Sequence, residues 1–127
     1  MDVIRRNTDY ALRMMVRLAR SGRDPWSSRR LAQTEGVSPQ LAAKLLQQLV
    51  RGGLVVSRRG KAGGFRLAGP PEAIDLGQVI AAIQGPVLLS GCVASARACP
   101  LQSRCAVCRK LGLVQRQLER TLAGTKL

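Results

Sequence analysis

The sequence predicts a mostly α-helical fold with one small β-hairpin and a long helix in its C-terminal part. Two observations lead to this prediction. Apolar residues recur at spacings of three and four along most of the chain, as they do on the buried faces of helices. One short segment, residues 54–67, instead places two strand-like runs on either side of a glycine-rich turn. A length of 127 residues is enough for one ordinary core.

The first half of the chain predicts three helices, over about residues 8–20, 27–35 and 38–51. Ser38 is a good N-cap for the third helix, and Pro39 follows it at a position where its missing N–H has no cost. The second and third helices, joined by a tight glycine-containing turn, indicate a helix-turn-helix. In this motif the second helix enters the major groove of DNA. The side chains expected to contact bases are Ser38, Gln40 and Lys44.

A hairpin follows directly, with expected strands at residues 54–56 and 65–67. Glycines permit its tight turn, and cations are concentrated at its tip. An ordinary surface hairpin is one interpretation of this segment. Its position directly after a helix-turn-helix favours a basic wing, which would contact phosphates or the minor groove. The expected wing contacts are Arg58, Arg59 and Lys61.

Two more helices are expected after the Pro70-Pro71 break. Asp75 and Gln78 have the spacing of a capping box, and that helix should stop at residues 85–86. The last helix should span about residues 105–123. Its apolar stripe would pack either against a second copy of the chain or against the protein's own core. The stripe consists of Val107, Leu111, Val114, Leu118 and Leu122.

The charge of the chain indicates a polyanionic partner. The 21 Lys and Arg residues outnumber the 7 Asp and Glu residues, which gives a net charge of +14, and 17 of the 21 are arginine. Arginine binds phosphate and guanine through two hydrogen bonds, so double-stranded DNA is the expected ligand. The chain has no histidine, no nucleophile or phosphate-loop motif and no clustered pair of carboxylates, so neither an enzyme nor a small-molecule substrate is expected.

The sequence predicts a cytoplasmic protein. Its N-terminal residues lack the apolar segment of a signal peptide, and no run of 18 apolar residues predicts a membrane span. In a reducing compartment, clustered cysteines favour metal binding over disulfides.

All four cysteines of the chain lie within 17 residues, at Cys92, Cys99, Cys105 and Cys108. Structural zinc usually recruits two close pairs of cysteines, and only Cys105 and Cys108 form one. The wide spacing of the other cysteines better suits an iron–sulfur cluster, either 2Fe–2S or 4Fe–4S. Zinc, a thiol–disulfide pair and inert buried thiols are the alternatives. Four nearby cations would lower thiol pKa values, namely Arg97, Arg104, Arg109 and Lys110.

Several short motifs together resemble a known family. They are residues 8–13 (TDYALR), 59–65 (RGKAGGF) and 71–74 (PEAI), followed by the cysteines and by residues 121–123 (TLA). In this order they resemble the winged-helix transcription regulators that include IscR and NsrR and that bind an iron–sulfur cluster. The resemblance covers nearly the whole chain.

The resemblance implies a homodimer in which the C-terminal helices cross and the cluster lies near the partner's DNA-binding domain. It implies that Cys92, Cys99 and Cys105 are ligands of the cluster. The fourth ligand would be Cys108, which we favour because thiolate is the softer donor, or Asp9 from the partner subunit. Asp9 could instead form an i,i+4 ion pair with Arg13.

These expectations define three regions. Residues 1–85 would form a winged helix-turn-helix domain, residues 86–108 a cysteine-rich cluster-binding loop and residues 105–127 a dimerisation helix. The expected function is transcriptional regulation, with binding to a pseudo-palindromic operator controlled by a cluster that senses nitric oxide, redox state or iron and cluster status. The alternative is a transcription factor that is stabilised by zinc or switched by thiol oxidation.

Overall fold

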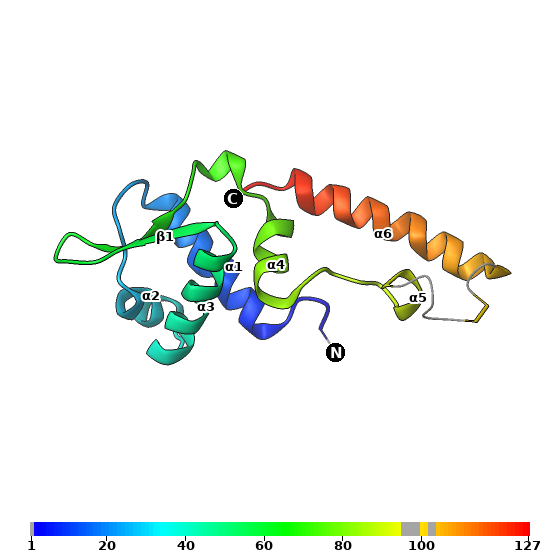
Figure 1. Ribbon diagram of the computed structural model, residues 1–127, viewed down its shortest axis with the longest axis horizontal. Helices are drawn as coiled ribbons and strands as arrows, with labels where there is room; N and C mark the ends of the chain where they lie inside the picture. Colours follow the sequence, from blue (N-terminus) through cyan, green and yellow to red (C-terminus); the bar gives the residue numbers. More distant parts are fainter. Residues whose placement is uncertain (1, 95–99, 102–103) are drawn as a thin grey trace.

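The computed structural model describes residues 2–94, 100–101 and 104–127 of the chain. Figure 1 shows an elongated molecule. Four helices and a hairpin form a body at one end, and a long helix extends away from it, with a short helix beside its far end. The helices are α1 (Arg6–Arg20), α2 (Ser28–Glu35), α3 (Pro39–Arg51), α4 (Leu76–Gln84), α5 (Gly91–Ala94) and α6 (Ala106–Gly124); the strands are β1 (Val55–Arg58) and β2 (Gly64–Leu67), and a 3₁₀ turn covers Pro71–Ala73.

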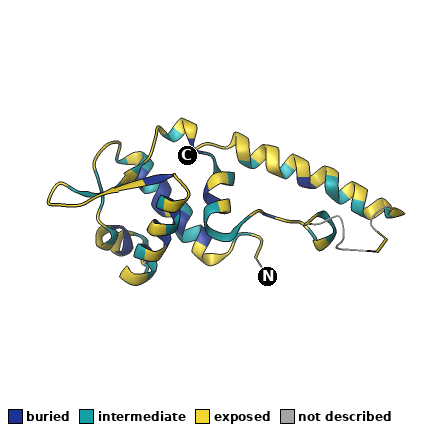
Figure 2. Cartoon of the chain, in the orientation of Figure 1, coloured by how far each residue is buried: buried dark blue, intermediate teal, exposed yellow. Residues whose placement is uncertain are grey.

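The buried residues concentrate in the body, as Figure 2 shows, whereas α6 is mostly exposed. The inner face of α1 supplies two fully buried methionines, Met14 and Met15, and α3 supplies three leucines that pack against it. Leucine, methionine, valine and alanine build nearly the whole core, as the scarcity of aromatic residues requires. The three core leucines of α3 are Leu45, Leu46 and Leu49.

The structure confirms the helix-turn-helix. The hydroxyl of Ser27 caps α2 by accepting a hydrogen bond from the Arg30 N–H at 3.1 Å. The hydroxyl of Ser38 caps α3 in the same way, by accepting from the Leu41 N–H at 3.1 Å. Between the two helices Gly36 has φ +70°, a left-handed conformation that glycine adopts without steric cost.

The hairpin is present in the predicted place, with Val55 paired to Leu67 and Arg58 to Gly64. Trp26, in the loop after α1, forms an isolated antiparallel bridge to β2, which was not predicted. Its N–H donates to the Phe65 carbonyl at 2.9 Å, and its carbonyl accepts from the Phe65 N–H at 2.7 Å. The hairpin is therefore attached, through Phe65 of β2, to the loop that follows α1.

Two helix starts differ from the sequence prediction. Helix α1 begins at Arg6, two residues before the predicted start at Thr8, and Gln84 of α4 satisfies the Arg5 N–H just outside it, at 3.0 Å. Helix α6 begins at Ala106, so Cys105 is its N-cap residue and has an extended backbone. The predicted capping box of α4 is present, with the Gln78 N–H bonded to Asp75 Oδ1 at 2.9 Å.

The C-terminal residues return to the body. The N–H of Leu76 donates to the Thr125 carbonyl at 2.9 Å, and the N–H of Leu127 donates to the Ile74 carbonyl at 3.1 Å. Asp75 and Lys126 thereby form an antiparallel bridge, and Leu127 packs against the core. Within the described residues, no helix has both the length and the hydropathy needed to cross a bilayer.

Candidate DNA interface and cysteine site

The three predicted base-contacting residues lie together at the start of α3. Gln40 and Lys44 are one helical turn apart and both are exposed. Ser38 is also exposed, and its oxygen already accepts the capping hydrogen bond from Leu41, so its hydroxyl hydrogen is what it can offer to DNA. This arrangement provides an amide, an amine and a hydroxyl on one accessible edge, which can read base edges or bind phosphate.

The three predicted wing cations lie at the far end of the hairpin. Arg58 ends β1, while Arg59 and Lys61 lie in the turn, and all three are exposed. Figure 1 shows this hairpin projecting from the body at the end opposite α5. No acidic residue occurs between Glu35 and Glu72, so α3 and the wing together form a purely cationic stretch of sequence. Such a stretch is well suited to a polyanion.

The structure adds an arginine that the sequence analysis did not select. Arg30 of α2 stacks over the ring of Trp26, with its guanidinium carbon 3.8 Å from the ring centroid. Stacking limits the rotamers of Arg30 and leaves the edge of its guanidinium, which carries the N–H groups, uncovered by the ring. In the sequence, Arg30 follows the only tryptophan by four residues, which places the two side chains within reach of each other. The bridge from Trp26 to β2 holds the ring in place for the stack.

The structure brings Cys92 of α5 and Cys108 of α6 together. The Cys108 thiol donates to the Cys92 carbonyl oxygen at 3.8 Å. The Cys92 sulfur and the Ser90 hydroxyl oxygen lie 2.9 Å apart in a hydrogen bond. Hydrogen bonds lower the pKa of the Cys92 thiol below its ordinary value, with the largest contribution from Ser90 and the next from Cys108. Burial opposes them by raising this pKa. A lower pKa increases the fraction of Cys92 that is present as thiolate, the form that binds metals.

The other two cysteines are placed differently. Cys105 is half-buried at the N-cap of α6, and Cys99 lies outside the described residues, as does Arg97. Among residues 2–94, 100–101 and 104–127, no three cysteine, aspartate or glutamate side chains lie close enough together to hold a metal ion. Cys92 and Cys108 nevertheless bring two soft sulfur donors close together, which is the donor chemistry that a thiolate-ligated centre needs.

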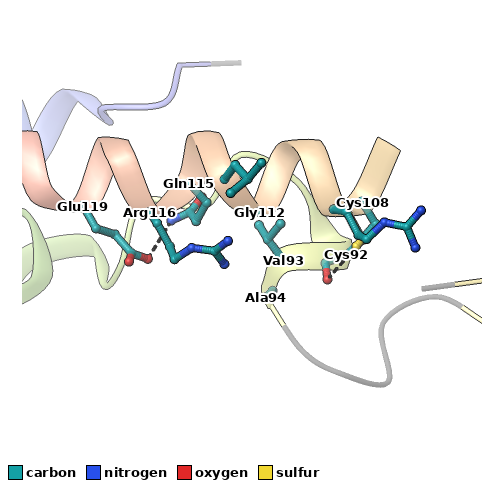
Figure 3. A pocket seen from close by; sticks show the side chains of 10 residues that line it. Cys92, Val93, Ala94, Cys108, Gly112, Gln115, Arg116 and Glu119 are labelled. Carbon is teal, nitrogen blue, oxygen red and sulfur yellow. Dashed lines mark hydrogen bonds between the residues drawn. The ribbon is translucent and has the colours of Figure 1, made fainter. Parts of the chain in front are cut away.

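A groove of about 680 Å³ runs between α5 and α6 beside this pair. Figure 3 shows Cys92 and Cys108 at one end of it, with Gln115, Arg116 and Glu119 along α6. Two of the lining side chains, Arg109 and Arg116, are cationic, whereas only Glu119 is acidic. The surroundings therefore favour anionic sulfur.

Asp9 forms the i,i+4 ion pair with Arg13 that the sequence allowed, with Arg13 Nη2 and Asp9 Oδ2 2.8 Å apart. It lies in the body on α1, whereas the Cys92–Cys108 pair lies beside the far end of α6. Asp9 is half-exposed, with 47% of its side chain accessible. A ligand role for Asp9 would thus require a second subunit.

Comparisons with known proteins agree with this architecture. The profile of the Rrf2 family, described as iron-dependent transcriptional regulators, matches residues 4–127. The HTH-type transcriptional repressor NsrR of Streptomyces coelicolor is 34% identical over 106 residues, which are 82% of this chain and 71% of that protein. The HTH-type transcriptional regulator CymR of Bacillus subtilis is 38% identical over 79 residues, 61% of this chain and 57% of that protein.

Solved structures show the same fold. CymR (YrzC), the global cysteine regulator of B. subtilis, superposes with a TM-score of 0.78 at 28% identity, over 99% of this chain and 93% of that one. T. potens IscR superposes with a TM-score of 0.74 at 25% identity, over 97% of this chain and 81% of that one. A helix-turn-helix with a basic wing, a long C-terminal helix and a family match over almost the full length lead to one conclusion: the chain belongs to the Rrf2 family of winged-helix transcriptional regulators.

Proposed function

We propose that this chain acts as a homodimeric repressor whose binding to a pseudo-palindromic operator is controlled by an iron–sulfur cluster. The observation that carries the proposal is the pairing of Cys92 with Cys108 between α5 and α6, at the opposite end of the molecule from the wing. The ligands would be Cys92, Cys99 and Cys105, with Cys108 as the fourth. The alternative fourth ligand is the partner subunit's Asp9. When bound, a cluster of this kind supplies a centre that reacts with nitric oxide or oxidants.

The exposed apolar side chains of α6 support the dimer. Val107, Leu113 and Val114 are 62%, 57% and 48% exposed, so three large apolar side chains of one helix remain in contact with water. A second α6 packed against them would remove them from water. Val107 and Val114 belong to the predicted stripe, and its other members, Leu111, Leu118 and Leu122, are half-buried within the chain itself. Helix α6 would therefore pack both against a second copy of the chain and against its own chain.

The far position of the cysteines indicates how a signal would reach DNA. Within one chain, α5 and the wing lie at opposite ends of the molecule (Figure 1). In a dimer with crossed α6 helices, the cysteine end of one subunit would lie against the body of its partner. The cluster-bound and cluster-free states must then differ in how they fit the operator. A ligand that binds two states equally does not shift the equilibrium between them.

The DNA contacts are tested by two substitutions. Gln40→Ala should relax the preference for one base pair, because its amide can read a base edge. Arg59→Ala should weaken binding to every sequence and reduce the salt-dependence slope by about one, because a phosphate contact carries no sequence information. Equal, sequence-independent losses from both variants, measured by fluorescence anisotropy at several salt concentrations, would refute the assignment of base reading to α3.

The cluster is tested by anaerobic purification, followed by an absorption spectrum and analysis of iron, sulfide and zinc per chain. Stoichiometric iron and sulfide support the proposal, and their loss in Cys99→Ala and Cys108→Ala would assign those ligands. A colourless protein with one zinc per chain would contradict it and indicate a structural metal.

A thiol switch is the second candidate, and the closeness of Cys92 and Cys108 favours it specifically. In this case two thiols would form a disulfide and lose two electrons and two protons to an oxidant such as a peroxide. A metal-free protein whose operator affinity changes after peroxide treatment, but not in Cys92→Ser, would support this candidate over the cluster.

A further inference from the structure

Gln115, in the middle of α6, is one of two polar side chains that are buried in the described part of the chain, the other being Thr8. Its side chain is 5% exposed, although α6 is mostly accessible to solvent. A buried amide is destabilising unless its hydrogen-bonding groups find partners. The position of those partners shows what Gln115 holds in place.

Both ends of the Gln115 amide bind the segment that leads from α4 to α5. Gln115 Nε2 donates to the Val87 carbonyl at 2.7 Å, and Gln115 Oε1 accepts from the Leu89 N–H at 3.0 Å. Nε2 also donates to Glu119 Oε1 at 3.0 Å, one turn further along α6. Val87 and Leu89 belong to no helix or strand, so Gln115 satisfies backbone groups that secondary structure does not.

Both segments joined by this attachment also carry a cysteine of the pair. Leu89 comes three residues before Cys92, and Gln115 follows Cys108 by seven residues, about two helical turns on the same face of α6. Figure 3 shows Gln115 and Cys108 facing the same groove. Fixing Leu89 to Gln115 therefore limits how far Cys92 can move away from Cys108.

We infer that Gln115 is a positioning residue, whose paired hydrogen bonds to Val87 and Leu89 hold Cys92 beside Cys108. A side chain with only a donor or only an acceptor cannot replace it, because the segment presents one carbonyl and one N–H. The inference rests on the proposed function in taking the cysteine pair as part of the sensor site. The position of the pair itself can be measured without any cluster.

The test uses the full-length chain with Cys99 and Cys105 replaced by serine, in the reduced and metal-free state. Dibromobimane becomes strongly fluorescent only when two nearby thiols displace both of its bromides. The parent protein should cross-link Cys92 to Cys108 efficiently, and Gln115→Leu should lower the cross-linking rate at least tenfold. Gln117→Leu is the matched control, because Gln117 lies on the same helix and is exposed. It should cross-link like the parent.

A second variant covers the case in which Gln115→Leu does not fold. Gln115→Asn keeps the amide but shortens the side chain by one methylene, so it should also reduce the rate, with the helical circular-dichroism signal unchanged. Parental cross-linking rates in folded Gln115→Asn or Gln115→Leu would overturn the inference, as would a parent that does not cross-link. None of these results depends on whether the protein binds iron, so failure of the inference and failure of the proposed cluster remain distinguishable.

Discussion

Gln84, the last residue of α4, should stabilise the fold by an amount that depends on Thr8. Its Oε1 accepts from the Thr8 hydroxyl at 2.7 Å and from the Arg5 N–H at 3.0 Å, and its Nε2 donates to the Val3 carbonyl at 2.9 Å. The side chain of Thr8 is fully buried. In Gln84→Ala, the Thr8 hydroxyl would lose the partner that the structure shows, and the exposed Arg5 N–H just before α1 would lose its acceptor.

The magnitude follows from these two losses. A buried hydroxyl without a partner costs about 1–3 kcal/mol, and loss of an ordinary hydrogen bond costs about 1 kcal/mol, so Gln84→Ala should lower the free energy of unfolding by about 2–3 kcal/mol. Thr8→Val removes the hydroxyl and preserves the shape, which should cost about 1 kcal/mol. In the double variant no hydroxyl remains unpaired, so its loss should be smaller than the sum of the two single losses by about 1 kcal/mol or more.

Urea unfolding followed by circular dichroism measures all four proteins of this cycle. The denaturant slope should stay constant, which shows that the variants unfold from comparable states. Additive losses, agreeing within about 0.3 kcal/mol, would refute the reasoning, because residues that do not interact give additive effects.

Three further predictions concern the functional surfaces. Asp9→Asn should change the free energy of unfolding by no more than about 0.5 kcal/mol, because its ion pair with Arg13 is half-exposed. The iron content of this variant should stay constant if Cys108 is the fourth ligand. A fall in iron content would assign Asp9 as the ligand instead. In the reduced, metal-free protein, Ser90→Ala should raise the pKa of Cys92, because the hydrogen bond from Ser90 is lost. Iodoacetamide should then modify Cys92 more slowly near neutral pH, and the rate should rise only at higher pH. An unchanged pH profile of the modification, followed by mass spectrometry, would contradict the role of Ser90. Gly63→Ala should weaken binding to all DNA sequences, because a Cβ at this position would overlap the Arg58 carbonyl and distort the wing. The control Gly69→Ala, where the added Cβ meets open space, should bind DNA like the parent. Equal DNA affinities of the two variants would show that the turn adapts to the added Cβ.

Local signals in the sequence predicted most of the fold. Ser38-Pro39 fixed the start of α3, Asp75 and Gln78 fixed the start of α4, and the glycines between Gly60 and Gly64 indicated the hairpin. Each of these signals acts between residues that are close in sequence, so its effect does not depend on how the rest of the chain folds.

The missed features all depend on distant residues. No local motif marks Gln84 or Gln115, and only the folded chain shows that they bond to residues 79 and 28 positions away. The edges of α3 show the same dependence, because the apolar Leu41 and the polar Gln48 are both half-buried. Periodicity predicts which face of a helix turns inward, but the neighbouring elements determine how far the residues at its edges are covered.

The cysteine site was predicted in its residue types but not in its arrangement. In the sequence Cys105 and Cys108 form the close pair, whereas the structure leaves Cys105 outside α6 and places Cys108 beside Cys92. That pairing requires the segment after α4 to fold back along α6, and no local motif encodes such a return.

The return of Thr125 and Leu127 to the body changes the mechanics of the long helix. Together with the segment after Gln84, it joins the α5–α6 unit to the body at two places, both of which involve α4 or the residues just before it. A unit joined at one place could rotate like a hinge and leave the body unaffected. Two attachments form a closed frame, in which displacement of the cysteine end exerts a torque on α4, and α4 packs directly against α1 and α3.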